Sequence, residues 1–309
     1  MKTTSTLRPS PTAILNPRLD PIFKAIFTQG TKESDLALKG LISAAVGKEV
    51  NSLMLQPNEP PVETPQNMQM SFDVSVVFND GERADIEIQG RQYDYDYGSR
   101  SEIQAARLLN MNAKKGDDWQ AEKVYQISVL NFAYDFAYDK DDNSPISWYT
   151  MRNDSGGRLG DRLNVIFLDL VKIRRLKGTP PEELTPIEKW GMFFAFADNP
   201  KEQEYLEKVK AGKEDIMAAD FIVKRMSEED ANWAFENSLY IGTTDYYAGI
   251  HGAERRARKE NAIENAKNFL KLGVLAETVA KGCSLPLEQV LELQKELEAA
   301  PVESATSMP

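Results

Sequence analysis

The chain has 309 residues, enough for one large domain or two smaller ones, and its 41% hydrophobic and 28% charged residues are typical of a soluble globular protein. A formal net charge of -11 excludes general affinity for nucleic acid, because duplex binding depends on Lys and Arg contacts to phosphate, so DNA contacts would require local basic patches. The single cysteine, Cys283, excludes an intramolecular disulfide and favours a reducing cytoplasm, while the single histidine, His251, excludes zinc sites built from His and Cys.

The N-terminal segment predicts a lead-in followed by two helices. Residues 1–15 are rich in Ser, Thr and Pro and lack the apolar run of a signal peptide, so we expect a flexible lead-in and no membrane segment. An apolar stripe predicts a helix over 16–27, where Asp20 stands before Pro21 in the position of an N-cap. A second amphipathic helix is predicted over 35–46.

The stretch 71–89 predicts two strands joined by a turn. Apolar residues fall at even positions on both sides of the turn, a period of two that is typical of strands. Polar residues fall at the odd positions between them. The even row contains Phe72, Val74, Val76, Phe78, Ala84, Ile86 and Ile88, and the odd row contains Asp73, Ser75, Arg83, Asp85, Glu87 and Gln89.

The length of the turn decides which side chains share a face, because residues directly opposite in an antiparallel pair point the same way. A two-residue turn would set Asp73 opposite apolar Ile88. A three-residue turn over 79–81, with Gly81 in the left-handed conformation of a bulge, sets Asp73 opposite Glu87. We predict the three-residue turn, because it also places the whole apolar row on one face.

Two carboxylates side by side on one wall repel each other and lose hydration, so they cost stability unless a cation lies between them. Mg²⁺ would supply that charge, since it binds a few carboxylate oxygens and keeps several waters. The alternative is that Asp73, Arg83 and Glu87 lie on the solvated face of an ordinary amphipathic hairpin.

The segment after the hairpin predicts a helix with a polar face. Residues 91–97 hold three tyrosines interleaved with aspartates, which suits either packing on the core edge or a mobile segment whose rings stack on bases. A helix is predicted over 99–111, in which Arg100, Gln104 and Arg107 share one face.

Four further stretches predict strands. Residues 124–132 are nearly continuously apolar, which is typical of a central strand covered on both faces. Residues 148–152 and 163–170 predict an additional pair, and 51–56 a first strand. The sequence therefore predicts the α/β class, a mixed sheet flanked by helices.

A basic run containing Lys172, Arg174 and Arg175 follows the last predicted strand. It is either a solvated edge or, if that edge lies beside the hairpin, a rim that contacts phosphate. From residue 180 onward the pattern is helical, beginning with a capping box from Thr185 to Glu188.

The C-terminal tail predicts a basic helix over 253–272 and two shorter helices over 274–281 and 285–297, whose spacing is that of a helix-turn-helix. Binding in a DNA groove and homodimerisation through an apolar seam are both open. The seam consists of Ile263, Ala266 and Leu270.

Together, the segment Asp20-Pro-Ile-Phe-Lys24, then Asp73, then Asp80-Gly81, then Ile86-Glu-Ile-Gln89 resembles the Rpn group of recombination-promoting nucleases and putative transposases, within the PD-(D/E)XK nuclease superfamily. The similarity covers about residues 16–135 and continues weakly in the basic tail. The resemblance implies a restriction-endonuclease-like fold and a metal-dependent phosphodiesterase that acts on DNA.

The resemblance also implies roles for individual residues. Asp73 and Glu87 would bind Mg²⁺, with Mn²⁺ as a substitute, and Asp20 would be an auxiliary acid as well as a cap. Gln89 stands where most of the superfamily carries a catalytic Lys; it is neutral, but it can orient water or a phosphate oxygen. Asp85 lies on the same face; we expect it at the rim of the site, with a further metal ligand as the alternative.

Residues of the following helix complete the implied site. Arg100 would neutralise a phosphate, and Gln104 holds a place where the family often has Tyr. Arg100 as an ordinary exposed helix residue is the alternative. The basic side chains Lys172, Arg174 and Arg175 would add phosphate contacts.

The sequence thus predicts a Mg²⁺-dependent DNA endonuclease in the cytoplasm, with a catalytically degenerate DNA- or protein-binding member of the same fold as the alternative. We expect four regions in the chain. They are a lead-in over 1–15, a nuclease core over 16–178, helices packed on that core over 179–250, and the tail over 251–309.

Overall fold

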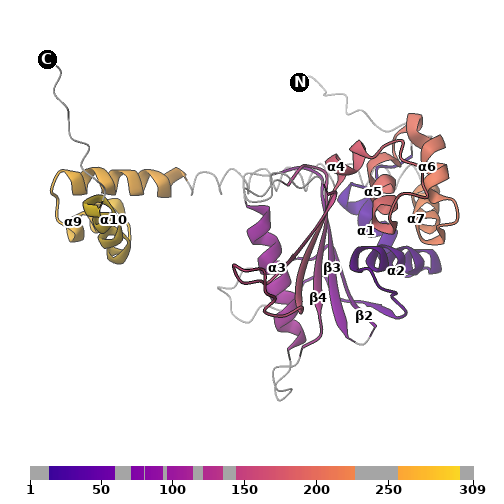
Figure 1. Ribbon diagram of the computed structural model, residues 1–309, viewed down its shortest axis with the longest axis horizontal. Coiled ribbons are helices and arrows are strands. Elements are labelled where there is room, and N and C mark those ends of the chain that lie inside the picture. Colours follow the sequence, from indigo (N-terminus) through magenta and orange to yellow (C-terminus); the bar gives the residue numbers. More distant parts are fainter. Residues whose placement is uncertain are drawn as a thin grey trace, which may run out of the picture. The chain divides into compact units, whose positions relative to one another are not determined.

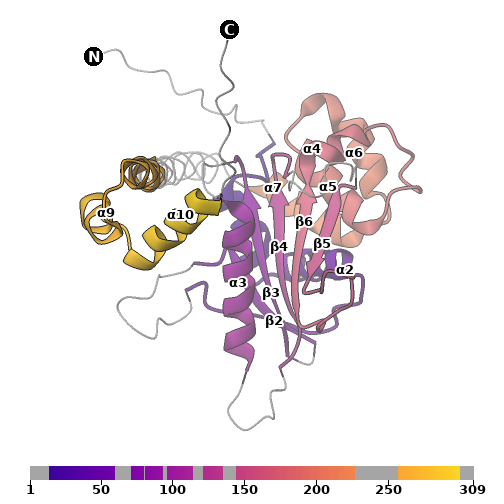
Figure 2. The same ribbon diagram turned by 60° about the vertical axis from the view of Figure 1, so that its left-hand side comes forward.

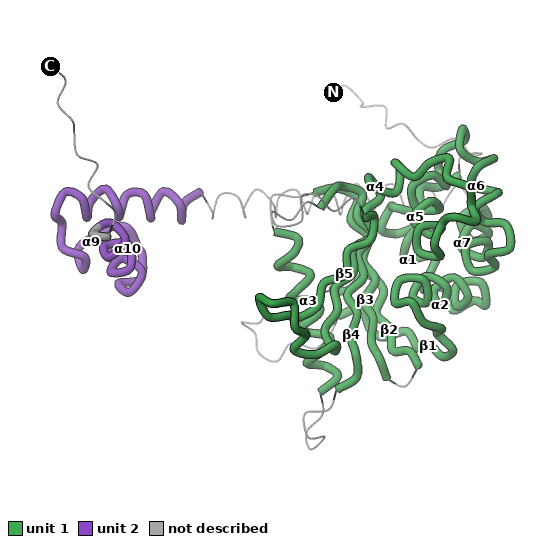
Figure 3. The backbone as a smooth tube through the Cα atoms, viewed as in Figure 1, with its two compact units in different colours: residues 1–243 green, residues 244–309 purple. Residues whose placement is uncertain are grey.

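The computed structural model describes residues 14–59, 71–79, 81–92, 96–113, 121–134, 144–226 and 257–299. The chain divides into two compact units, residues 1–243 and 244–309, which Figure 3 shows in different colours. None of the helices within the described ranges combines the length and the apolar character that a membrane crossing requires.

The first unit is built on a six-stranded mixed sheet with the order β1-β2-β3-β4-β6-β5. Figure 1 labels β2, β3 and β4 of this sheet. β3, β4 and β6 are mutually parallel, and the other neighbours are antiparallel. Every residue of β4 is buried, which confirms a central strand and, with the flanking helices, the predicted α/β class. The strands are β1 Leu53–Leu55, β2 Val74–Phe78, β3 Glu82–Gln89, β4 Val124–Leu130, β5 Ile146–Thr150 and β6 Leu163–Asp169.

β2 and β3 form the predicted hairpin in the predicted register. Val74 lies opposite Ile86, as a three-residue turn requires, so the two-residue turn is excluded. Positive φ angles at Asn79 (46°) and Gly81 (106°) reverse the chain there. Glycine suits the second of these positions because it has no Cβ to clash with the backbone.

Phe72 departs from the predicted apolar row. β2 begins at Val74 after a bend at Asp73, and Phe72 packs with Leu108 and Val124 instead of with the other even-numbered residues. The period of two holds only while the chain is extended, so the bend turns Phe72 to the opposite face of the sheet.

Helices cover both faces of the sheet (Figures 1 and 2). α1 and α2, with α5 and α7 packed against them, cover the face on which Ala84, Ile86 and Ile88 join the main apolar core. α3 covers the other face and contacts β3, β4 and β6. The helices of this unit are α1 Asp20–Thr28, α2 Lys32–Val46, α3 Tyr97–Asn112, α4 Leu170–Arg175, α5 Pro186–Phe196, the 3-10 turn Pro200–Glu202, α6 Gln203–Lys210 and α7 Glu214–Arg225.

Capping explains where several helices begin. Thr185 and Glu188 form the predicted capping box of α5. Asp169 ends β6 and caps α4 by accepting hydrogen bonds from two backbone N–H groups. The N-cap of α1 is Leu19, with no side-chain cap bond, so the interpretation of Asp20 as the N-cap is wrong and its carboxylate serves elsewhere.

The second unit contains a helix over 257–271 followed by α9 Ala276–Cys283 and α10 Leu287–Ala299. Ala266 is fully buried in its small apolar core, and Ile263 and Leu270 pack against the same core. The seam that we considered for dimerisation is therefore used inside the unit. The predicted start of its first helix, 253–256, lies outside the described residues.

Candidate active site

The face of the sheet under α3 carries a buried polar patch. The odd-numbered residues of β3 lie on this face, since the even-numbered ones join the core under α1 and α2. Asp85 and Glu87 are 0% exposed and Gln89 is 8% exposed. Burying this much polarity is costly without compensation, which points to a function. Further buried polar residues of the patch are Ser75, Ser101, Gln104, Gln126 and Ser128.

Asp73 and Glu87 are joined by reciprocal hydrogen bonds at one end of the hairpin. The backbone N–H of Asp73 donates to Oε1 of Glu87 over 3.0 Å, and the backbone N–H of Ile88 donates to Oδ2 of Asp73 over 3.1 Å. Each carboxylate thus accepts a bond from the main chain beside the other. The structure brings these two acids together, as the register requires.

Two basic side chains contact these acids, one from each helical layer. Lys24 of α1 places Nζ 3.1 Å from Oδ1 of Asp73 and 3.1 Å from Oδ1 of Asp20. Arg100 of α3 places Nη2 3.1 Å from Oε2 of Glu87. The site therefore gathers three of the predicted acids, and Arg100 is bound to one of them.

The acids are held in an environment that disfavours their charged forms. Burial raises the pKa of Glu87 to about 8, and the charge of Asp73 adds to the increase while Arg100 opposes it. Burial and Asp73 also raise the pKa of Asp20 to about 6. An additional positive charge would favour the charged forms, so the site favours binding of a cation.

Two glutamines lie in the same patch. Gln104 is almost fully buried, and its side chain hydrogen-bonds Glu87, which lowers the pKa of that acid against the effect of burial. Gln89 is the last residue of β3 and is paired in register with Leu130 of β4. Because both amides are neutral, the positive charge of the site comes from the two helices.

Asp85 does not lie at the rim, and that prediction is wrong. It is fully buried between Ser75 of β2 and Gln126 of β4. Among the described residues, neither of its carboxyl oxygens has a hydrogen-bond partner, and burial with Glu87 beside it raises its pKa well above the usual range. A protonated, neutral Asp85 fits this position. Strand parity indicates the face of a residue but not how deeply α3 covers it.

The basic run after β6 divides into three environments. Lys172 is buried, Arg174 is partly buried and donates to Oδ1 of Asn131, and Arg175 is exposed. β3, β4 and β6 are parallel and α4 follows β6 directly, so this run begins at the same edge of the sheet as Gln89. Of these three basic residues, Arg175 alone presents an exposed side chain there.

A model of a known family matches most of the chain. The family model described as PD-(D/E)XK nuclease family transposase matches residues 17–253, which include all six strands and both helices that contribute to the site. The chain belongs to this family. The resemblance seen in the sequence is thereby confirmed. Neither the curated proteins nor the solved structures gave a significant match.

PD-(D/E)XK nucleases generally use divalent metal ions, and the acids of this transposase-family site fit one. Asp73 and Glu87 offer hard carboxylate oxygens anchored by backbone bonds, and they already attract Lys24 and Arg100. In the described part of the chain, no group of three or more His, Cys, Asp or Glu residues is placed to hold an ion. Water and phosphate would complete the ligands, as is usual for Mg²⁺.

Sequence reasoning missed Lys24 as a member of the site. The residue ends the Asp20-to-Lys24 segment, and its spacing of four from Asp20 is the one that pairs side chains along a helix, so a signal was present. It also left two interpretations of Tyr97 open, packing on the core edge and stacking on bases. Tyr97 is buried at the start of α3, with its hydroxyl 2.9 Å from Oγ of Ser128, so the packing interpretation holds there; residues 93–95 lie outside the described ranges.

Proposed function

We propose that this PD-(D/E)XK nuclease family transposase is a metal-dependent endonuclease that hydrolyses phosphodiester bonds in DNA. The observation that carries the proposal is that Glu87 accepts a hydrogen bond from the N–H of Asp73 and Asp73 accepts one from the N–H of Ile88. Lys24 and Arg100 contact the two acids. Carboxylates placed so close together, and so deeply, are stable in the charged state only with cations beside them.

Asp73 and Glu87 would hold Mg²⁺ or Mn²⁺, which polarises a phosphate and lowers the pKa of an attacking water. Gln89 orients that water or a phosphate oxygen, because its amide both donates and accepts hydrogen bonds. Arg100, anchored by Glu87 and partly exposed, reaches toward the substrate. Asp20 is the auxiliary acid.

DNA contacts in this proposal are local, because the net charge of -11 repels a polyanion overall. Arg100 and Gln104 serve the cleaved phosphate. Exposed Arg175 contacts the DNA backbone at the edge of the sheet where Gln89 lies. Arg174, which is partly buried, and Lys172, which is buried, add positive charge there.

The second candidate is a catalytically degenerate member that binds DNA or a protein without cutting. Gln89 motivates it, because a neutral amide stabilises a phosphate less than a charged group does. The acidic composition also favours it.

Nicking of supercoiled plasmid by the wild type, Asp73→Ala and Glu87→Ala, with Mg²⁺ or Mn²⁺, tests the proposal. We expect nicking by the wild type and loss of it in both variants. Glu82→Ala is the matched control, because Glu82 lies at the opposite end of β3 and is paired with Lys48.

Equal nicking by the wild type, Asp73→Ala and Glu87→Ala would contradict the endonuclease proposal. Absence of nicking by the wild type at high enzyme concentration would also contradict it. A gel shift with Asp73→Ala then identifies a binder that does not cut. Removing the residues after 252 in the same assay tests the tail, because a tail that contacts phosphate would contribute affinity that falls with salt.

We also propose a role in DNA recombination in the cytoplasm, on the basis of the family and of the single cysteine. We propose as well that the chain divides into regions at residues 178 and 250, and that it forms a homodimer. Two sites are needed to cut both strands of a duplex at once, which is the argument for the dimer.

A further inference from the structure

Lys24 contacts the acids of the site but has no chemical role in the proposed mechanism. It projects from α1 and lies 3.1 Å from carboxylate oxygens of both Asp20 and Asp73. These acids come from different elements, one from α1 and one from the bend before β2. A single ammonium group thus bridges the helix to the hairpin at the point where a metal ligand is proposed.

The ammonium group keeps its charge in this position. Burial opposes the charged form of Lys24, but Asp73 and Asp20 outweigh burial, and the pKa of Lys24 is raised above its ordinary value. The side chain is 32% exposed, so it is not sealed from solvent. Its four-carbon stem allows the charged end to move without unfolding α1.

The site needs such a charge. Hydrolysis of a phosphodiester increases the negative charge on the phosphate oxygens, and preorganised cationic donors are what stabilise that charge. Gln89 on β3 is neutral. Among the residues that the structure describes, Lys24 contacts Asp73 and Arg100 contacts Glu87.

We propose that Lys24 is a resident counter-ion that becomes the cationic phosphate contact of this site. Without a metal ion, its ammonium group balances Asp20 and Asp73. When a divalent ion binds Asp73, the ammonium group is repelled from that oxygen and, still held by Asp20, turns to the phosphate. Asp20 is then the positioning residue for Lys24. The phosphate contact rests on the proposed nuclease function, whereas the counter-ion role does not.

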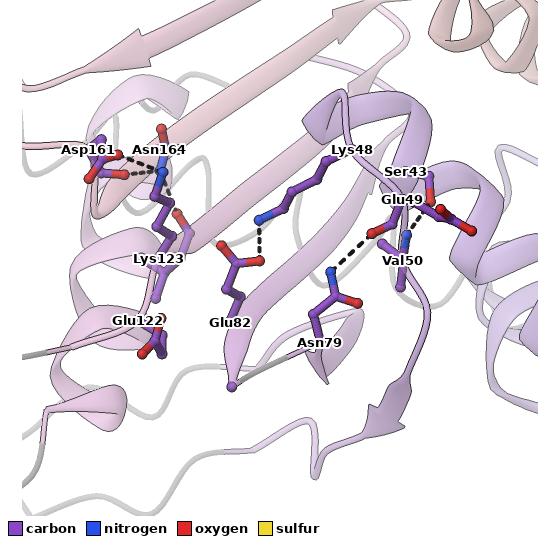
Figure 4. A network of polar contacts seen from close by, with 12 residues as sticks. Ser43, Lys48, Glu49, Val50, Asn79, Glu82, Glu122, Lys123, Asp161 and Asn164 are labelled. Atoms are coloured by element: carbon purple, nitrogen blue, oxygen red, sulfur yellow. Dashed lines mark hydrogen bonds and ion pairs between the residues drawn. The ribbon is translucent and has the colours of Figure 1, made fainter.

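Lys48 provides a matched control for Lys24, because its acidic partner lies at the other end of β3 from Glu87. It is bound to Glu82, the first residue of β3, and Figure 4 shows this pair. Its side chain is 36% exposed, close to the value for Lys24, and its Nζ lies 5.5 Å and 5.4 Å from the rings of Phe78 and Tyr125. Lys48 therefore has one acidic partner and an aromatic platform, which suits a structural role.

The test compares Lys24→Met with Lys48→Met in the full chain. Titration calorimetry with Mn²⁺ alone should show about fivefold tighter binding for Lys24→Met, because a competing positive charge is gone. Plasmid nicking by the same variant should fall about 100-fold. Lys48→Met should leave both quantities near wild type. A merely structural lysine would not tighten metal binding while slowing cleavage.

The other outcomes are also decisive. Unchanged or weaker Mn²⁺ binding by Lys24→Met overturns the counter-ion role, and unchanged nicking overturns the phosphate contact. Lys24→Arg keeps the charge and should nick within about tenfold of wild type; a loss as large as that of Lys24→Met would overturn the requirement for charge. If Lys24→Met fails to fold, as judged by thermal unfolding in EDTA, Lys24→Gln replaces it under the same expectations.

The two proposals fail in different ways. A wild type that never cuts removes the nuclease function and the phosphate contact together. Calorimetry would still decide the counter-ion role, because Mn²⁺ binding is measured without substrate.

Discussion

The two faces of β3 differ in what they bury. On one face Ala84, Ile86 and Ile88 are packed in the main apolar core, where burial stabilises the fold. On the other face Asp85 and Glu87 are buried just as completely, at a cost in free energy. Along this strand, apolar residues whose burial stabilises the fold alternate with acids whose burial costs free energy. The same degree of burial therefore raises the stability of the fold on one face and lowers it on the other.

The largest effect should come from neutralising the polar face. Glu87→Gln keeps the shape of the side chain but removes the charge that a metal ion requires, so nicking should fall by about a thousandfold. Thermal unfolding in EDTA at pH 8 should show no loss of stability, because a buried charge has been removed. A variant that cuts normally, or that is unfolded, would contradict this distinction between the faces.

The neighbouring apolar face should respond in the opposite way. Ile86→Ala leaves a cavity in the main core and should lower the free energy of unfolding by about 2–5 kcal/mol, measured by urea denaturation. Nicking per folded molecule, measured well below the midpoint temperature, should stay within about tenfold of wild type. If the activity of the folded variant collapsed, the two faces would not be separable.

A smaller effect concerns pH in the metal-free protein. The pKa of Glu87 rises from 4.5, its ordinary value, to about 8 on folding, so the folded chain binds this proton more tightly than the unfolded chain does. The contribution of Glu87 to stability is therefore complete below pH 4.5 and is lost as the pH rises toward 8. Unfolding free energies in EDTA should fall across this window in the wild type, and less steeply in Glu87→Gln. Parallel slopes would contradict the assignment to Glu87.

The smallest effect should come from Asp85→Asn. Burial raises the pKa of Asp85, which favours its neutral form, so we expect a neutral amide of similar shape to change little. Nicking should remain within about tenfold of wild type, and the unfolding free energy within about 1 kcal/mol. A loss of nicking as severe as that of Glu87→Gln would show instead that Asp85 acts in its charged form.

The features that sequence reasoning predicted are local ones. The hairpin register follows from a period of two and a three-residue turn, both contained in one short stretch, and it places Asp73 beside Glu87. The basic run was located along the chain in the same way. The environments of its members, from buried Lys172 to exposed Arg175, depend on packing that the run itself does not encode.

The features that were missed depend on how separate elements pack. The depth of Asp85 depends on α3, which follows β3 in the chain and packs across β3, β4 and β6. The role of Lys24 depends on α1 reaching the bend at Asp73. That bend also places Phe72 on the opposite face from its expected row. The residue types in this stretch do not signal the break in the extended chain, so the pattern did not predict it.

The reciprocal bonds at the hairpin have a consequence for the order of folding. Asp73 and Glu87 are only 14 residues apart, and Glu87 and Arg100 only 13, so these partners have low contact order and close rapidly. Lys24 and Asp73 are farther apart in the sequence, so we expect their contact to form later. We therefore expect the acids to meet before Lys24 reaches Asp73, and Mg²⁺ should accelerate refolding of the wild type but not of Asp73→Asn, as stopped-flow measurements would reveal.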